Sequence, residues 1–212
     1  MRIKISSDDK EEIMKIGRIV KSGGVIVYPT DTVYGIGGDP LREDVVARVK
    51  EIKGRGEKAM PILVSSLEKA MDIAIFGGLS KELAEEFWPG SLTIVLRTKI
   101  NFPRSLTAGE DSIGIRMPNH DLALKIIEAS GGVLIGTSAN ISGMPPIKSV
   151  EELDKRIEEK VDLVIDGGIV KLGVPSTVIK VESEDERRIR IIRRGAIGIE
   201  EFTKRGILIE GI

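Results

Sequence analysis

Short apolar runs and amphipathic segments alternate along most of this chain. Residues 8–12 are acidic except for Lys10 and open a segment whose isoleucines have helical spacing, and the apolar run 25–28 follows directly after Gly23 and Gly24. The same pattern predicts further helices at 43–52, 67–73, 80–87, 121–129 and 150–157, with Ser80 and Asn119 as start signals for the third and fourth of these. It predicts further strands at 61–65, 92–97, 113–116, 133–136, 163–165, 177–181 and 189–193.

This alternation predicts an α/β fold. Helices interleave with strands in a way typical of parallel pairing, whereas the last two strands are expected to form an antiparallel hairpin across the charged turn 183–187. We therefore expect a twisted mixed parallel/antiparallel sheet flanked by helices. Because no linker, repeat or low-complexity tract interrupts the pattern, we expect a single domain over residues 1–212.

Composition excludes several classes of function. The formal net charge is −1, so no overall field draws the chain to nucleic acid or membranes. No apolar run approaches the roughly 20 residues of a spanning helix, and no signal-peptide pattern opens the chain, so we expect a cytoplasmic protein. Cysteine is absent, which excludes disulfides, thiolate nucleophiles and zinc–thiolate sites.

The most informative segment is 28–35, Tyr-Pro-Thr-Asp-Thr-Val-Tyr-Gly, which follows an apolar strand. Pro29 cannot donate to a sheet ladder, so the strand is expected to end there. The hydroxyls of Thr30 and Thr32 then lie at the carboxyl end of a strand, where open α/β sheets bind ligands. The alternative is a turn held by threonine hydrogen bonds.

Cations follow other predicted elements. Lys53 and Arg55 flank Gly54 beyond a helix end, where they either complement the helix dipole or bind phosphate. Arg116 ends an apolar strand, and a partly desolvated guanidinium there needs an internal acid or an anionic ligand as partner. The small-residue loop 137–143 carries Ser138 and Asn140, which suit neutral hydrogen bonds to a base, ribose or phosphate, although Ser138 also suits a helix cap.

Missing motifs narrow the choice. The chain has neither a P-loop nor a Gly-x-Gly-x-x-Gly fingerprint, so a nucleotide site here is of another kind. His120 is the single histidine and has no paired serine or aspartate motif, so we do not predict it to be catalytic. No acidic or histidine cluster has metal-ligand spacing. We therefore expect any metal to be Mg²⁺ arriving with phosphate.

Several of these motifs occur together in a fixed order. They lie at 28–35, 53–55, 61–65, 87–93, 116–118, 138–143 and 175–177. As an ordered set they closely resemble the YrdC-type threonylcarbamoyl-adenylate synthases, and the resemblance extends over about residues 8–200. It implies a nucleotidyltransferase that joins L-threonine, bicarbonate and ATP, with Mg²⁺, into threonylcarbamoyl-AMP and pyrophosphate. A tRNA threonylcarbamoyl transferase complex would then use this product to modify an adenosine of tRNA.

The resemblance also assigns roles by matching position. It implies that threonine is bound by Thr32, Ser65, Arg116 and Ser176. It implies that ATP is bound by Lys53, Arg55, Ser112, Ser138, Asn140 and Arg193, with Lys53, Arg55 and Arg116 as the catalytic residues. The chain departs from the family pattern at Ser65, where many members have histidine, and at Gly56, where proline is common.

Two other functions fit the same residues. Related domains are associated with double-stranded RNA and tRNA, and a positive face could form from Arg187, Arg188, Arg190, Arg193, Arg194 and the loop 50–58. A carbamoyl-adenylate enzyme that serves another acceptor is the other alternative. Such relatives usually carry a zinc-finger segment, for which this chain has no cysteine.

Overall fold

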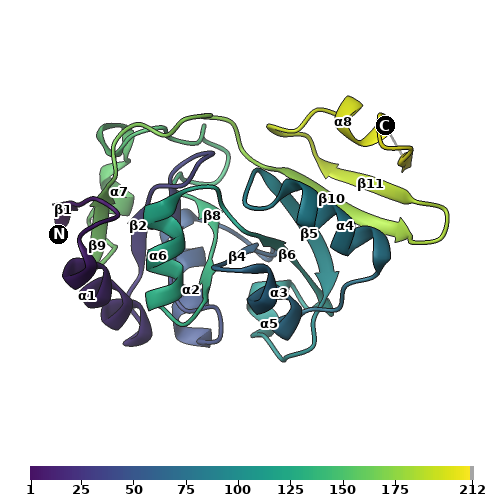
Figure 1. Cartoon of the computed structure of the whole chain (residues 1–212). Helices are drawn as coiled ribbons and strands as arrows, with labels where there is room; N and C mark the ends of the chain where they lie inside the picture. The colour runs from purple at the N-terminus through teal and green to yellow at the C-terminus, as the bar shows by residue number, and fades with distance from the viewer. Residues whose placement is uncertain (211–212) are drawn as a thin grey trace.

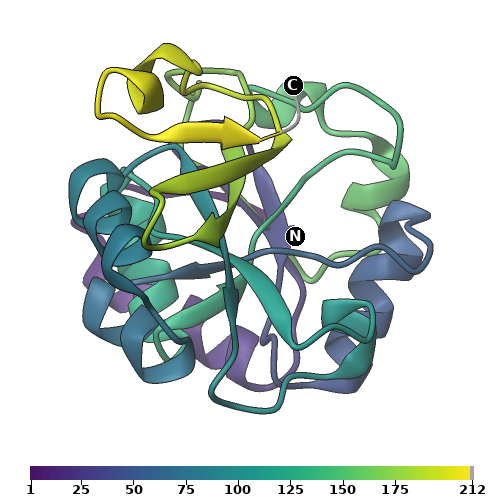
Figure 2. The same cartoon turned by 90° about the vertical axis from the view of Figure 1, so that its right-hand side faces the viewer.

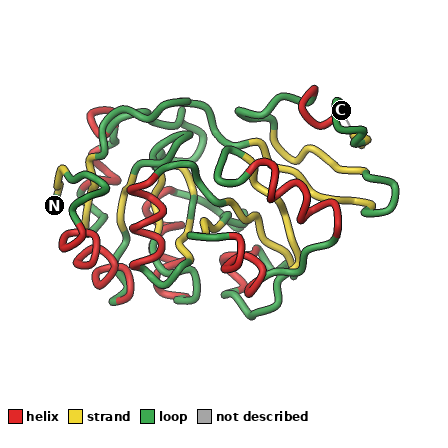
Figure 3. Tube along the Cα trace, in the orientation of Figure 1, coloured by secondary structure: helices red, strands yellow, loops and turns green. Residues whose placement is uncertain are grey.

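The computed structural model describes residues 1–210, in which two mixed sheets are covered by helices (Figures 1 and 3). The five-stranded sheet has the order β1 (Arg2–Lys4), β9 (Leu163–Asp166), β2 (Ile26–Tyr28), β3 (Gly35–Gly37) and β8 (Thr137–Ser138). The seven-stranded sheet has the order β12 (Leu208–Glu210), β11 (Arg188–Arg193), β10 (Thr177–Ser183), β5 (Leu92–Arg97), β6 (Ser112–Arg116), β4 (Ile62–Val64) and β7 (Val133–Ile135).

The predicted α/β class with mixed strand pairing is confirmed, with the strands divided between two sheets instead of one. The helices are α1 (Lys10–Lys21), α2 (Glu43–Lys53), α3 (Leu67–Ile73), α4 (Gly78–Phe87), α5 (Arg104–Thr107), α6 (Asp121–Ala129), α7 (Lys155–Glu158) and α8 (Glu200–Thr203). A 3₁₀-helix, η1, covers Val150–Glu152. In the described residues no helix is both long enough and apolar enough to cross a membrane.

The two sheets meet where one stretch of chain passes from one to the other. β7 pairs with β4 in the large sheet, and after Gly136 the same stretch continues as β8 and pairs with β3 in the small sheet. The Tyr28 hydroxyl donates to the carbonyl oxygen of Ile135, 2.7 Å away. A Cβ atom at Gly37 would overlap this same carbonyl, so glycine lets β3 pass close to the crossing chain.

Apolar faces explain where the helices lie. α1 and α6 cover the small sheet, with Ile16 of α1 and Ile126 of α6 in one buried cluster with strand residue Ile26 (Figure 1). A larger cluster joins the inner faces of both sheets to α2, α3 and α4. The hairpin of β10 and β11 pairs as expected, and with α8 it lies at the end of the molecule opposite β1 (Figures 1 and 2).

Some predicted element boundaries were wrong. Residues 150–157 form η1 and the short helix α7 instead of one helix, because Leu153 is extended and Asp154 accepts from the Arg156 N–H to start a new turn. α4 begins at Gly78, with Ser80 inside its first turn accepting from the Gly77 N–H. The cap of α6 is His120, not Asn119, since His120 Nδ1 accepts from the Ala123 N–H at 3.3 Å.

Candidate active site

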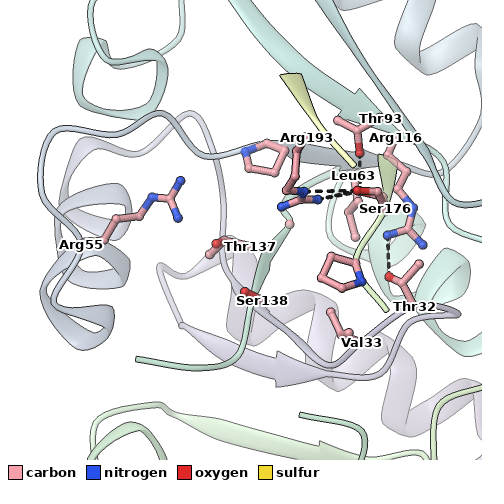
Figure 4. Close-up of a pocket in the computed structure, with 13 residues that line it drawn as sticks. Thr32, Val33, Arg55, Leu63, Thr93, Arg116, Thr137, Ser138, Ser176 and Arg193 are labelled. Atoms are coloured by element: carbon pink, nitrogen blue, oxygen red, sulfur yellow. Dashed lines mark hydrogen bonds between the residues drawn. The ribbon is translucent and has the colours of Figure 1, made fainter. Parts of the chain in front are cut away.

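A cavity opens at the junction of the two sheets, where side chains from both converge (Figure 4). It is lined by Thr32, Val33, Arg55, Pro61, Leu63, Thr93, Arg116, Gly136, Thr137, Ser138, Pro175, Ser176 and Arg193. The sequence-predicted site residues Thr32, Arg55, Arg116, Ser138, Ser176 and Arg193 are therefore brought together, although they come from distant parts of the chain. This convergence makes the cavity the candidate active site.

Arg116 is the buried cation of this cavity, with 5% of its surface exposed. Its Nε donates to the carbonyl oxygen of Gly90 at 2.7 Å, and its Nη1 donates to Thr32 Oγ1 at 2.8 Å. Its Nη2 donates to the carboxylate of Asp31. Burial lowers the pKa of Arg116, and the Asp31 carboxylate opposes that shift, so the guanidinium stays charged. The interpretation with an internal acid is therefore confirmed, and an anionic ligand for Arg116, which also lines the cavity, stays a prediction.

The two threonines of the 28–35 segment have different roles. Thr30 Oγ1 donates to the Val33 carbonyl at 2.7 Å and accepts from the Thr32 N–H at 3.2 Å, so Thr30 holds the turn. Thr32 lines the cavity and accepts from Arg116. The turn interpretation is therefore right for Thr30, whereas Thr32 faces the cavity and its contact with a ligand stays a prediction.

A second group of polar atoms lies beside Arg116. Ser176 Oγ is 2.8 Å from Thr93 Oγ1, and Arg193 Nη2 donates to Ser176 Oγ at 3.0 Å (Figure 4). Thr93 was not predicted as a site residue. Its signal in the sequence is a hydroxyl within the apolar part of β5, residues 92–96, and this signal is weak because such a threonine is equally typical of a strand.

The cavity carries an excess of positive charge. Arg55 lies across the cavity from Arg116 and donates through Nη2 to the Ala59 carbonyl at 2.6 Å (Figure 4). Burial lowers the pKa of Arg55 and of Arg193, and the charge of Arg55 lowers the pKa of Arg193 further, so the two guanidinium groups face a common space. Three arginines with one neighbouring carboxylate, that of Asp31, favour an anionic ligand.

Lys53 lies behind the 137–143 loop, outside the lining of the cavity. It is 1% exposed, and its Nζ donates to the Asn140 carbonyl at 2.7 Å and to the Ser138 carbonyl. Gly54 ends α2 with φ +58°, a left-handed turn that separates the directions of Lys53 and Arg55. In this structure Lys53 therefore orders the loop. Its predicted contact with ATP phosphates stays a prediction.

Lys53 is expected to give the protein a distinct pH dependence of stability. Burial, with a contribution from Arg55, lowers the pKa of Lys53 to about 7 from 10.5. Between these values the unfolded chain binds one more proton than the folded chain, so the free energy of unfolding rises with pH in that window. The Tm of the wild-type protein minus the Tm of Lys53→Met is expected to increase by about 5 °C between pH 7 and pH 9, measured by thermal melts. If the Tm of the two proteins changed with pH in parallel, the lowered pKa of Lys53 would be contradicted.

Besides Lys53, three further predicted site residues are not part of the cavity lining. Ser112 begins β6 and Arg116 ends it, which separates them by about 13 Å along the strand. Ser65 follows β4, and its N–H donates to the Gly132 carbonyl at 3.1 Å. Asn140 Nδ2 donates to the Met144 carbonyl at 2.7 Å, while its Oδ1 is buried without a hydrogen-bond partner.

The remaining side-chain types that often act in catalysis or metal binding do not form a second site in the described residues. His120 caps α6, and burial lowers its pKa, so its imidazole is a neutral hydrogen-bond acceptor. Among the residues that the structure describes, no group of three or more His, Cys, Asp or Glu side chains is arranged to hold a metal ion. The groups of this site that can bind or polarise a ligand are therefore its arginines and hydroxyls.

Comparison with known proteins decides the family. Residues 18–195 match the Sua5/YciO/YrdC family model, which carries the description "Telomere recombination". The chain belongs to this family. Sua5 of Pyrococcus abyssi, solved in complex with L-threonine, is similar to it with a TM-score of 0.90 at 34% identity, covering 99% of this chain and 62% of that chain. Escherichia coli YciO gives a TM-score of 0.83 at 27% identity, covering 95% and 98%.

Relatives in the Sua5/YciO/YrdC family differ in length. The threonylcarbamoyl-AMP synthase of P. abyssi is 37% identical over 87% of this chain, which spans about half of that relative (54%). A putative threonylcarbamoyl-AMP synthase of Methanocaldococcus jannaschii is also 37% identical, over 95% of this chain and 96% of the relative. The resemblance to YrdC-type proteins that the ordered motifs predicted is therefore confirmed.

Proposed function

We propose that this protein is an L-threonylcarbamoyladenylate synthase. The observation that carries the proposal is the placement of three arginines around one cavity. Arg116 is buried at one side and donates to the Thr32 hydroxyl, Arg55 lies at the opposite side, and Arg193 lies between them. One guanidinium suits the carboxylate of an amino acid and the others suit phosphates. Support comes from relatives named threonylcarbamoyl-AMP synthase and from a similar structure that holds L-threonine.

The threonine subsite would be formed by Thr32, Arg116 and Ser176, which lie together in the cavity. ATP would bind toward Arg55, Ser138 and Arg193, with Lys53 reaching the phosphates only if its contacts to the loop carbonyls break. Asn140 would act through that loop. The placement of Ser65 and Ser112 supports no contact with either substrate.

The reaction proceeds in two steps. The amine of threonine attacks the carbon of bicarbonate or CO₂ and forms a carbamate, with loss of water in the case of bicarbonate and of a proton to solvent in the case of CO₂. A carbamate oxygen then attacks the α-phosphorus of ATP, the bond from that phosphorus to the bridging oxygen breaks, and pyrophosphate leaves. Arg116 would hold the amino acid, while Arg55 and Arg193 would stabilise charge on the phosphates. Neither step requires a protein nucleophile.

Mg²⁺ is expected to enter with ATP. Asp31, the carboxylate beside the cavity, is already paired with Arg116, and no ligand cluster exists among the described residues. Phosphate oxygens and water are the usual ligands of Mg²⁺ in such sites. Bound in this way, the ion would reduce the negative charge of the triphosphate.

We extend the proposal to the fate of the product. Threonylcarbamoyl-AMP is a reactive mixed anhydride, so an acceptor has to receive it soon after release. We propose that a tRNA threonylcarbamoyl transferase complex consumes it in the cytoplasm. The relatives' named activity supports the synthase step of this route.

The structure favours the enzyme over an RNA-binding module. Three of the arginines that would form a positive face on the β10–β11 hairpin are paired with glutamates, and a fourth, Arg193, lines the cavity instead. The pairs are Arg187 with Glu82 at 2.7 Å, Arg188 with Glu186 at 2.6 Å and Arg190 with Glu182 at 2.8 Å. Paired charges release few counterions, so the expected affinity of this face for RNA is low.

The test is pyrophosphate release from ATP with Mg²⁺ and bicarbonate, measured with L-threonine, with L-serine and with no amino acid. Threonine-dependent release is expected, with serine used about 10- to 100-fold less efficiently because it lacks one methyl group. No release from a folded protein that binds ATP would contradict the proposal. A synthase that serves another acceptor would release pyrophosphate without preference for threonine.

A further inference from the structure

Asp31 is a buried carboxylate that the proposed reaction does not use directly. It is 5% exposed and directly precedes Thr32, which lines the cavity. We infer that Asp31 is a positioning residue, which orients the Arg116 guanidinium so that its free N–H groups meet the carboxylate of threonine. This inference rests on the proposed function and names a residue that the family resemblance did not assign.

Counting donors shows what Asp31 does to Arg116. A guanidinium has five N–H groups, and three are engaged here: Nε by the Gly90 carbonyl, one on Nη1 by Thr32 and one on Nη2 by Asp31. One N–H remains on each terminal nitrogen. A carboxylate binds such a pair through two parallel hydrogen bonds. Without Asp31, the Nη2 side of the fork loses the contact that fixes its plane.

Asp31 is itself held in place. Its Oδ1 also accepts from the backbone N–H of Asn119 at 3.2 Å, and its carbonyl accepts from the Leu172 N–H at 3.1 Å. The carboxylate is thus fixed by the chain that leads into α6, and its backbone by the loop after β9. A rigid acceptor of this kind transmits its position to the guanidinium.

The position of the carboxylate, more than its charge, carries the effect. The Asp31–Arg116 pair is close to neutral as a unit, so Asp31 weakens the attraction of Arg116 for a substrate anion. A carboxylate in this place is therefore a disadvantage unless the orientation of Arg116 compensates for it. The expected consequences differ for variants that keep the geometry and variants that keep the charge.

The experiment compares Asp31→Asn with Asp31→Glu. Asparagine keeps an acceptor oxygen at the same distance, whereas glutamate keeps the charge but moves it by one methylene. The KM for threonine is expected to rise about 100-fold in Asp31→Glu and less than 10-fold in Asp31→Asn, with kcat and the KM for ATP within about 3-fold of wild type. Asp44→Asn is the matched control, because Asp44 pairs with Arg42 at 2.7 Å on the surface, and it is expected to match wild type.

Thermal melts and ATP binding show that each variant is folded. A threonine KM lower in Asp31→Glu than in Asp31→Asn would overturn the inference, since charge would then be the function of Asp31. Equal losses for threonine and ATP would also overturn it and indicate a structural role. Threonine affinity by calorimetry, without ATP, separates the two proposals. The proposed function alone would be refuted if threonine affinity fell from wild type to Asp31→Asn to Asp31→Glu while the wild-type protein released no pyrophosphate.

Discussion

Replacing Arg116 by lysine is expected to lower kcat/KM for threonine by about 1,000-fold. Lysine keeps a cation for the buried Asp31 but loses the planar fork that a substrate carboxylate needs. Two charge-assisted hydrogen bonds of about 2 kcal/mol each are lost, which corresponds to about three orders of magnitude. Alanine would be a poorer test, because it leaves the Asp31 carboxylate buried without its cation and costs about 3–5 kcal/mol of stability.

Arg97→Lys is the matched control for Arg116→Lys. Arg97 lies on the neighbouring strand β5 and pairs with Asp111 at 2.9 Å, but both side chains are exposed and outside the cavity. This variant is expected to have wild-type kinetics. Steady-state pyrophosphate release with varied threonine measures both variants. An Arg116→Lys enzyme with kcat/KM within 3-fold of wild type would show that Arg116 does not hold the amino acid.

Replacing Arg55 by alanine is expected to reduce kcat by about 1,000-fold and to leave threonine binding unchanged. Like Arg193, Arg55 has no acidic partner within salt-bridge distance among the described residues, so its charge is available to phosphate. Arginines that stabilise charge on a transferring phosphoryl group contribute about 10³–10⁵ in rate. The lost bond to Ala59 concerns an exposed loop, so the fold is expected to survive.

Lys58→Ala is the control for Arg55→Ala. Lys58 belongs to the same loop and its side chain is exposed, while its contact with Arg55 uses the backbone carbonyl. Single-turnover kinetics with bound threonine measure the chemical step, and calorimetry measures threonine affinity. If both variants keep wild-type turnover, the anionic subsite lies elsewhere and the ATP placement proposed here is wrong.

Local signals predicted most of the individual elements but not how they associate. Strands such as β5 and β6 and helices such as α2 and α6 were expected within one to two residues, because each has a clear apolar period. β1, β3 and β12 were missed, since charged residues or glycines interrupt these short strands (Arg-Ile-Lys, Gly-Ile-Gly and Leu-Ile-Glu), which leaves no apolar run. The helix predicted at 150–157 was wrong because a run of apolar spacing does not reveal that Leu153 is extended.

The sequence by itself determined the family, the α/β class and the residue types that end the strands at the cavity. These properties depend on order along the chain, and the motifs preserve that order. Tertiary structure alone decided that Asp31 holds Arg116, that Lys53 binds the 137–143 loop and that Ser112 lies away from the cavity. The reason is physical: each of these depends on contacts between residues about 85 positions apart, or on the direction of a strand within its sheet. Packing of the whole chain sets both, and local periodicity sets neither.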